Sequence, residues 1–127
     1  MEPVFIVIVL ALIEYSVLGV LVGRARSVHG VKAPATTGPE AFERVHRAHQ
    51  NTLEALIVFV PAVWIFGMYV SPLWAAGLGI VFIIGRALYA RGYITAAEKR
   101  GPGAVTSFLT NYVLMLGGLV GVIMAML

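Results

Sequence analysis

Apolar residues form four long runs along the chain, and polar residues gather in the segments between them. The runs occupy about 3–25, 39–70, 73–100 and 104–126; the second begins with polar residues and the third ends with them. A helix needs about 20 mainly apolar residues to cross a bilayer, and each run reaches that length. The pattern predicts an all-α integral membrane protein, a four-helix bundle of up-down topology that forms one domain over residues 1–127.

Short local signals predict where these helices begin and end. Thr37, with Glu40 three residues later, has the spacing of a capping box and predicts the start of the second helix. Pro61 lies inside an apolar stretch, so we expect a kink there rather than an end. Ser71-Pro72 predicts a tight turn, and Gly101-Pro102-Gly103 predicts the break between the third and fourth helices.

The composition excludes a soluble globular domain. The 127 residues are 60% hydrophobic and only 12% charged, whereas soluble domains carry about 25% charged residues. The chain has no cysteine, so it has no thiolate metal site and no cysteine nucleophile. Any sulfur chemistry must therefore come from a ligand. Gly117 and Gly121 in the fourth run have the G-x-x-x-G spacing that allows membrane helices to pack closely.

The positive charges indicate how the helices cross the membrane. All nine Lys and Arg residues lie within 24–47 or 86–100. Four spans put these two segments on the same side, which the positive-inside rule makes cytoplasmic. Both termini and the 71–72 turn are then expected on the non-cytoplasmic side. We expect a multi-pass protein of a bacterial inner membrane, surrounded by membrane lipid and without a nucleic-acid partner; the endoplasmic reticulum is the alternative location.

The densest polar cluster of the chain lies at 43–54. Glu43, Arg47, Asn51 and Glu54 follow one another at spacings of three and four residues, which puts them on one helix face. Glu54 is expected at or below the edge of the hydrocarbon, where an ionisable group is costly and typically functional. The alternative is an interfacial helix whose charges are merely solvated.

The third run carries a similar polar face. Arg86, Tyr89, Tyr93 and Arg100 lie at offsets of 3, 7 and 14 from the first of them, again on one side of a helix. Arginine binds carboxylates through two parallel hydrogen bonds, and a deep carboxylate suits an ammonium group. With Arg26 at the end of the first run, these residues predict a small anionic or zwitterionic ligand near the cytoplasmic surface.

Two other interpretations stay open from the residues alone. Glu14 lies in the middle of the first run, and a carboxyl group at that depth is also found in small proton-coupled exporters. His46 and His49, together with Glu43, are metal-ligand types, but this spacing is a weak signal and no third ligand is evident. We therefore expect no metal site.

Two separated motifs resemble the signature of the MAPEG family, the membrane-associated proteins of eicosanoid and glutathione metabolism. The first is Thr36-Thr37-Gly38-Pro39, then Phe42-Glu43-Arg44-Val45-x-Arg47-Ala48-x-x-Asn51-x-x-Glu54. The second is Arg86-x-x-Tyr89-x-x-x-Tyr93, with Arg100 beyond it. The resemblance covers nearly the whole chain. It implies a homotrimer of four-helix subunits that binds glutathione between neighbouring subunits at the cytoplasmic end.

The resemblance also implies an activity. The implied activity is that of a microsomal-type glutathione transferase, a detoxification enzyme. Such an enzyme conjugates its co-substrate glutathione to lipophilic electrophiles, with or without peroxidase activity. Arg100 matches the position of the residue that activates the thiol. The positions that match glutathione-binding residues are Arg26, Arg47, His49, Asn51, Glu54, Arg86, Tyr89 and Tyr93. A non-catalytic relative that binds lipid or partner proteins is the alternative.

The implied mechanism has a simple physical basis. A free thiol has a pKa of about 8.5, so little of it is thiolate at neutral pH. A guanidinium beside the sulfur favours the charged form, and lowering the pKa by about two units corresponds to roughly 2.7 kcal/mol. Ser27 and Ala55 stand where one branch of the family has an arginine and a tyrosine, which affects the expected second substrate and the affinity for glutathione.

Overall fold

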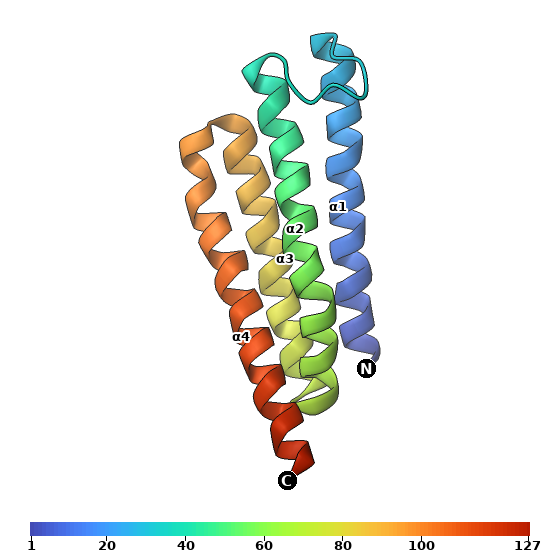
Figure 1. The fold of residues 1–127 in the computed structure, drawn as a ribbon, viewed down its shortest axis with the longest axis vertical. Coiled ribbons are helices and arrows are strands. Elements are labelled where there is room, and N and C mark those ends of the chain that lie inside the picture. The colour runs from blue at the N-terminus through green and yellow to red at the C-terminus, as the bar shows by residue number, and fades with distance from the viewer.

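The computed structural model describes residues 1–127 and contains four long helices and one short 3-10 turn. They are α1 (Glu2–His29), α2 (Glu40–Tyr69), α3 (Pro72–Thr95), η1 (Ala97–Arg100) and α4 (Gly101–Met126). The four long helices run side by side, with α2 and α3 between α1 and α4 (Figure 1). The structure has no strand, which confirms the all-α prediction.

The outer surface of the bundle is apolar along most of its length. Four helical segments of 24 to 30 residues are long and apolar enough to cross a membrane. Large side chains such as Val20, Leu73, Trp74 and Met124 are mostly exposed. Lipid tails can cover such side chains where water cannot do so without cost. The apolar helices and their apolar outer faces therefore support an integral membrane protein.

The interior packs around aromatic rings and small residues. Phe59 of α2 and Phe82 of α3 are fully buried and stack with their ring centroids 4.0 Å apart. A Cβ atom on Gly117 would lie 2.5 Å from the Phe66 ring, and one on Gly121 would lie 2.9 Å from the Tyr69 carbonyl oxygen. The predicted packing role of this glycine pair is confirmed, because only hydrogen at these two positions lets α4 approach α2.

The ends of the first two helices differ in detail from the sequence prediction. α1 continues to His29 and stops at Gly30, whose φ of 67° lies in the left-handed region that glycine favours. The predicted capping box at Thr37 is wrong, because the residue before α2 is Pro39 and no side chain caps the helix. α2 does not end at Pro61 but continues to Tyr69.

The largest correction concerns the connection between α3 and α4. The predicted break at Gly101-Pro102-Gly103 is wrong, because α3 already ends at Thr95 and these three residues form the first turn of α4. Proline is accommodated in a first turn, where its missing N–H would have had no partner. Arg100 therefore lies in η1, the short turn between α3 and α4, rather than on α3.

The polar connections lie together at one end of the bundle. Figure 1 shows the segment between α1 and α2 and the turn between α3 and α4 at the same end. The two chain termini and the turn between α2 and α3 lie at the opposite end. Basic and acidic residues from distant parts of the sequence are thereby brought to one end, where the candidate site forms.

Candidate functional site

A polar cavity of about 310 Å³ lies between α2, the end of α3 and η1. We call it the polar pocket. Its lining residues are Arg47, Gln50, Asn51, Glu54, Tyr89, Tyr93 and Arg100. Six of the nine residues predicted from the sequence thus line one cavity, and Gln50 joins them from the same helix. Gln50 was not among the predicted site residues, because it is not part of the family motif.

The α2 side of the pocket carries two charges that no other residue neutralises. Arg47 and Glu54 form no ion pair and no side-chain hydrogen bond, since the ion pairs of the chain are Met1–Glu2 and Glu40–Arg44. Arg47, Asn51 and Glu54 project from successive turns of one face, as their spacing predicts. The pocket therefore offers a free cation and a free carboxylate to a ligand.

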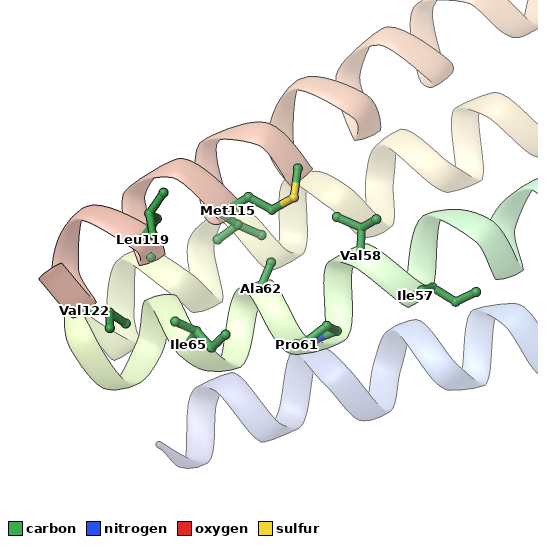
Figure 2. Close-up of a pocket in the computed structure, with 10 residues that line it drawn as sticks. Ile57, Val58, Pro61, Ala62, Ile65, Met115, Leu119 and Val122 are labelled. Atoms are coloured by element: carbon green, nitrogen blue, oxygen red, sulfur yellow. The ribbon is translucent and has the colours of Figure 1, made fainter.

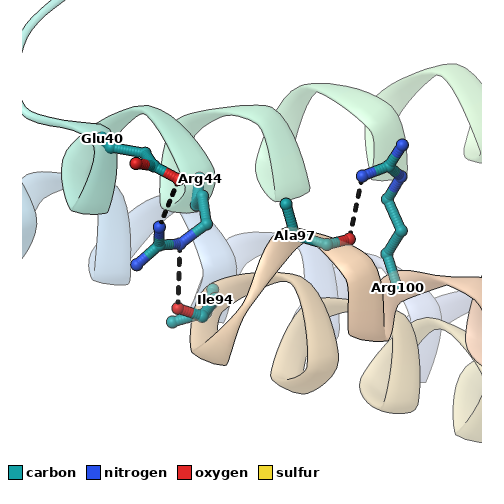
Figure 3. A network of polar contacts seen from close by, with 5 residues as sticks. All are labelled: Glu40, Arg44, Ile94, Ala97 and Arg100. Atoms are coloured by element: carbon teal, nitrogen blue, oxygen red, sulfur yellow. Dashed lines mark hydrogen bonds and ion pairs between the residues drawn. The ribbon is translucent and has the colours of Figure 1, made fainter.

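The other side of the pocket is formed by two tyrosines and an arginine. The rings of Tyr89 and Tyr93 meet edge to face, with centroids 5.7 Å apart. The guanidinium carbon of Arg100 lies 5.3 Å from the centroid of the Tyr93 ring. Arg100 Nη1 donates a hydrogen bond to the carbonyl oxygen of Ala97 at 2.8 Å, which Figure 3 shows. One bond of this kind leaves most of the guanidinium donors available to a ligand.

Arg86 lies behind the pocket and not in it. Its side chain is 2% exposed and makes hydrogen bonds to three side chains from α2 and α4. Nη2 donates to Asn51 Oδ1 and to Thr52 Oγ1, both at 2.8 Å, and Nη1 donates to Ser107 Oγ at 3.1 Å. The guanidinium carbon also lies 4.2 Å from the centroid of the Tyr89 ring.

Arg86 thereby holds two residues of the polar pocket in place. Because the carbonyl oxygen of Asn51 accepts from Arg86, the amide N–H groups of Asn51 remain available to a ligand. The acceptors Thr52 and Ser107 were missed from the sequence. Nothing in their spacing indicates that they meet a buried arginine from α3.

Two other predicted residues lie outside the polar pocket. Arg26 Nη1 donates to the carbonyl oxygen of Ala35 at 2.7 Å, and its guanidinium carbon lies 5.1 Å from the Phe42 ring centroid. His49 faces α1, where its ring stacks on Tyr15 with centroids 4.3 Å apart. Neither residue lines the pocket.

A charged contact ties α2 to the end of α3 near the pocket. Arg44 Nη1 lies 2.9 Å from Glu40 Oε1, and Arg44 Nε donates to the carbonyl oxygen of Ile94 at 3.3 Å. Figure 3 shows this contact at the same end of the bundle as Arg100. It joins the start of α2 to the last turn of α3 and so holds the two walls of the pocket together.

Two further cavities continue from the polar pocket along α2 and α4. The first, of about 400 Å³, includes Asn51 and Glu54 in its lining and has Arg86 at one side; we call it the mixed cavity. The second, of about 430 Å³, shares Val58 and Met115 with the mixed cavity and is almost entirely apolar; we call it the apolar groove. Figure 2 shows the α2 and α4 side chains that line the groove.

Comparison with known proteins identifies relatives over most of the chain. A human protein, microsomal glutathione S-transferase 2, is 40% identical over 114 residues, which are 90% of this chain and 78% of the relative. An uncharacterized protein of Synechocystis sp. is 49% identical over 114 residues, 90% of this chain and 83% of the relative. Leukotriene C4 synthase of Cavia porcellus is 42% identical over 77 residues, 61% of this chain and 51% of the relative.

The family profile described as MAPEG matches residues 4–120. This match covers both motifs and reaches into all four long helices. The resemblance seen in the sequence is thereby confirmed, and the chain belongs to the MAPEG family.

Proposed function

We propose that the protein is a membrane-bound glutathione transferase that conjugates glutathione to lipophilic electrophiles and so serves in detoxification. The polar pocket carries this proposal, because it combines Arg47, Glu54 and Arg100 with neutral hydrogen-bonding groups in one small cavity. Glutathione has two carboxylates, one ammonium group and a thiol. In the pocket, Glu54 matches the ammonium group, Arg47 matches one carboxylate and Arg100 matches the thiol. The names of the human and Cavia porcellus relatives agree with chemistry of this class.

The charges of the pocket suggest how the tripeptide is held. Glu54 accepts from the ammonium group and Arg47 binds a carboxylate, since both are free of other partners. Asn51, fixed through Arg86, and the tyrosine hydroxyls donate neutral hydrogen bonds. Arg26 does not line the pocket of its own chain, so in this proposal it reaches glutathione in a neighbouring subunit of a homotrimer.

Arg100 supplies the chemical step in this proposal. Its guanidinium lowers the pKa of the glutathione thiol, because a positive charge favours the thiolate. The thiolate sulfur then bonds to the electrophilic carbon, and the electron pair of the broken bond leaves with the leaving group or moves onto the electrophile. The position of Arg100 in the η1 turn supports this role, since the turn brings its guanidinium into the pocket.

The cavities along α2 and α4 suggest the route of the second substrate. The apolar groove lies on a lipid-facing part of the bundle and continues into the mixed cavity, which shares Asn51 and Glu54 with the polar pocket. A lipophilic electrophile can thus leave the bilayer through apolar surroundings and meet the thiolate at the boundary with the polar end. We place that end on the cytoplasmic side of a bacterial inner membrane, because all nine basic residues lie in segments 24–47 and 86–100.

A binding and activity assay on the purified protein tests this function. Glutathione added to the protein in detergent should give the ultraviolet absorbance of a thiolate at neutral pH, where free glutathione gives almost none. Conjugation of 1-chloro-2,4-dinitrobenzene should then be observed, and a panel including lipid hydroperoxides should separate transferase from peroxidase activity. Glutathione that binds without a thiolate signal and without turnover would favour a non-catalytic lipid- or partner-binding protein.

Glu14 supports a second candidate function, proton-coupled export. Its Oε1 atom is buried in the middle of α1 and has no hydrogen-bond partner. Buried carboxyl groups at such depths are found in proton pathways. Reconstituted vesicles with an imposed proton gradient test this alternative. Gradient-driven efflux of a lipophilic cation that is lost in Glu14→Gln would support it, and equal efflux from protein-free vesicles would exclude it.

A further inference from the structure

Asn111 of α4 has an unused hydrogen-bond acceptor in the bundle interior. The side chain is 6% exposed, and its Nδ2 atom donates to the carbonyl oxygen of Ala55 at 3.1 Å. Its Oδ1 atom is buried and has no partner. A buried acceptor without a donor is costly, most of all within a bilayer, where bulk water cannot reach it.

None of the neighbouring polar side chains donates to this oxygen. Arg86 donates to Asn51, Thr52 and Ser107. Ser107 donates to the carbonyl oxygens of Gly103 and Ala104, and Thr110 donates to the carbonyl oxygen of Thr106. The bundle around Asn111 therefore has a free acceptor and no donor committed to it.

The place of Asn111 connects this oxygen with the proposed reaction. Asn111 lines the mixed cavity, together with Asn51, Glu54 and Arg86. It is bonded to Ala55, the residue directly after Glu54, so its amide lies about one helical turn or less from the wall shared with the polar pocket. On the other side the cavity continues through Val58 into the apolar groove. A lipophilic molecule that extends from the groove through the mixed cavity to the polar pocket enters the space that Asn111 lines.

We infer that Asn111 makes the protein selective for lipophilic electrophiles that carry a hydrogen-bond donor, such as a hydroxyl group, close to the reacting carbon. The inference rests on the proposed glutathione transferase function and adds the class of its second substrate. The donor binds Asn111 Oδ1 after a small rotation of the amide, while the hydrocarbon tail lies in the apolar groove. The side chain acts on specificity and takes no part in bond formation.

A hydroxylated α,β-unsaturated aldehyde is a suitable probe. In its reaction the glutathione sulfur bonds to the β-carbon, the double-bond electrons move toward the carbonyl oxygen, and a solvent proton finally adds to the α-carbon. No oxidant or reductant is needed. The matched compound is the methyl ether of the same aldehyde, which keeps the electron-withdrawing oxygen and the chain length but cannot donate a hydrogen bond.

The test compares 4-hydroxynon-2-enal with 4-methoxynon-2-enal. For each compound kcat/KM is divided by its uncatalysed rate constant with glutathione, which removes differences in intrinsic reactivity. The wild-type protein should favour the hydroxyl compound by about tenfold, the usual effect of leaving a buried polar group unpaired. Asn111→Leu should bring this ratio close to one. Thr110→Val is the matched control, because it removes a buried polar group on the same helix outside the cavity, and it should preserve the ratio.

Three results would overturn the inference. One is a wild-type ratio near one, which needs no variant and so does not depend on whether Asn111→Leu folds. A second is an Asn111→Leu protein that is less stable and slower toward both compounds but keeps the ratio, because Asn111 would then be only a link between α2 and α4. The third is a Thr110→Val protein in which the ratio falls toward one as far as it does in Asn111→Leu.

A binding measurement separates this inference from the proposed function. Nonan-4-ol and 4-methoxynonane are unreactive, and NMR titration of the protein in detergent micelles measures the affinity for each. The wild-type protein should bind the alcohol more tightly, and Asn111→Leu should bind both alike. If no electrophile is conjugated but this difference is found, the transferase proposal fails while the Asn111 subsite stands. Equal binding of both compounds to the wild-type protein would contradict the subsite itself.

Discussion

The three arginines around the polar pocket differ in what holds them. Arg86 is buried and donates to Asn51, Thr52 and Ser107, whereas Arg100 has one hydrogen bond and Arg47 has none. A guanidinium whose donors are used by the protein fixes its neighbours, and one with free donors can bind a ligand. In the proposed function, Arg86 positions its neighbours, and Arg47 and Arg100 bind the ligand.

Replacing Arg100 should affect the thiol and leave the binding of glutathione intact. In Arg100→Ala the pKa of the bound thiol should rise toward about 8.5, so the conjugation rate at neutral pH should fall by roughly 20-fold. The lowered thiol pKa increases the fraction of thiolate only at pH values below the pKa of the free thiol, because above it the thiol ionises without help. The lost rate should therefore return partly as the pH is raised through about 8.5. Steady-state kinetics against pH measures this, with calorimetry for glutathione affinity.

Arg100→Lys should restore only part of the activity, because a point charge lacks the planar fork of the guanidinium. An Arg100→Ala protein that turns over like the wild type at neutral pH would remove Arg100 from the mechanism.

Glu54 and Arg47 should contribute directly to glutathione affinity. Glu54→Gln and Arg47→Ala each remove one charged partner of a zwitterionic ligand, so each should weaken binding by about tenfold or more. Glu2→Gln is the control, because Glu2 is an exposed carboxylate at the opposite end of the bundle and lies outside the pocket. Isothermal titration calorimetry measures all three proteins. Unchanged affinity in both pocket variants would mean that the site has been misplaced.

Arg86 should contribute to glutathione affinity by holding Asn51 in place, and it should also stabilise the folded protein. Arg86→Met leaves the buried acceptors on Asn51, Thr52 and Ser107 without their donor, so we expect a lower melting temperature and a glutathione affinity reduced about tenfold. The pKa of the thiol of bound glutathione should stay as in the wild type, because Arg86 does not line the pocket. A variant with a raised thiol pKa would instead show that Arg86 acts on the sulfur.

The turn between α3 and α4 explains why the polar pocket closes at that end. A Cβ atom on Gly103 would overlap the backbone of Tyr89, whereas one on Gly101 would meet nothing within 4 Å. The first turn of α4 therefore rests directly on the part of α3 that carries Tyr89. This close approach positions η1, and with it Arg100, beside Tyr93.

Alanine substitutions at these two glycines should have opposite effects. Gly103→Ala forces α3 and α4 apart and should cost about 1–3 kcal/mol of stability, because overpacked helix contacts relax only partly. Gly101→Ala should be neutral or slightly stabilising, because alanine favours the helix by up to about 1 kcal/mol over glycine. Thermal unfolding in detergent measures both. Equal melting temperatures for the two variants would contradict the tight contact.

The whole bundle separates polar from apolar surfaces along its length. Both polar connections lie at the end where the pocket forms, and the lipid-facing sides of the helices are apolar (Figure 1). This arrangement fits the proposed function, in which the site faces water and the second substrate approaches from the bilayer. We propose the orientation in the membrane from the basic residues, which favour the cytoplasmic side.

Single cysteines can test this orientation, because the natural chain has none. Lys32→Cys and Gly101→Cys should react with a membrane-impermeant maleimide only from the cytoplasmic side. Val70→Cys, beside the opposite turn, is the control and should react only from the other side. Labelling of either of the first two positions from outside would refute the proposed topology.

Sequence periodicity was sufficient for the number and type of helices, because a membrane span needs a long apolar run and tolerates few alternatives. It also placed Arg47, Asn51 and Glu54 on one face, since that follows from helix geometry alone. Helical spacing also made Tyr89, Tyr93 and Arg100 candidates, and the family motifs gave them roles in glutathione binding and thiol activation. These predictions depend on residues close together in the chain or on a pattern already known from relatives.

Such patterns do not predict the contacts between helices. Arg86 sits behind the pocket because acceptors from α2 and α4 meet it there, and His49 faces Tyr15 because of how α1 packs. Arg100 enters the pocket because α3 ends early, which the glycines and proline after it did not reveal. The free oxygen of Asn111 exists only because its amide nitrogen reaches Ala55 on another helix. Local sequence carries no information on which side chains meet across a helix interface, so these features emerge only when the bundle is assembled.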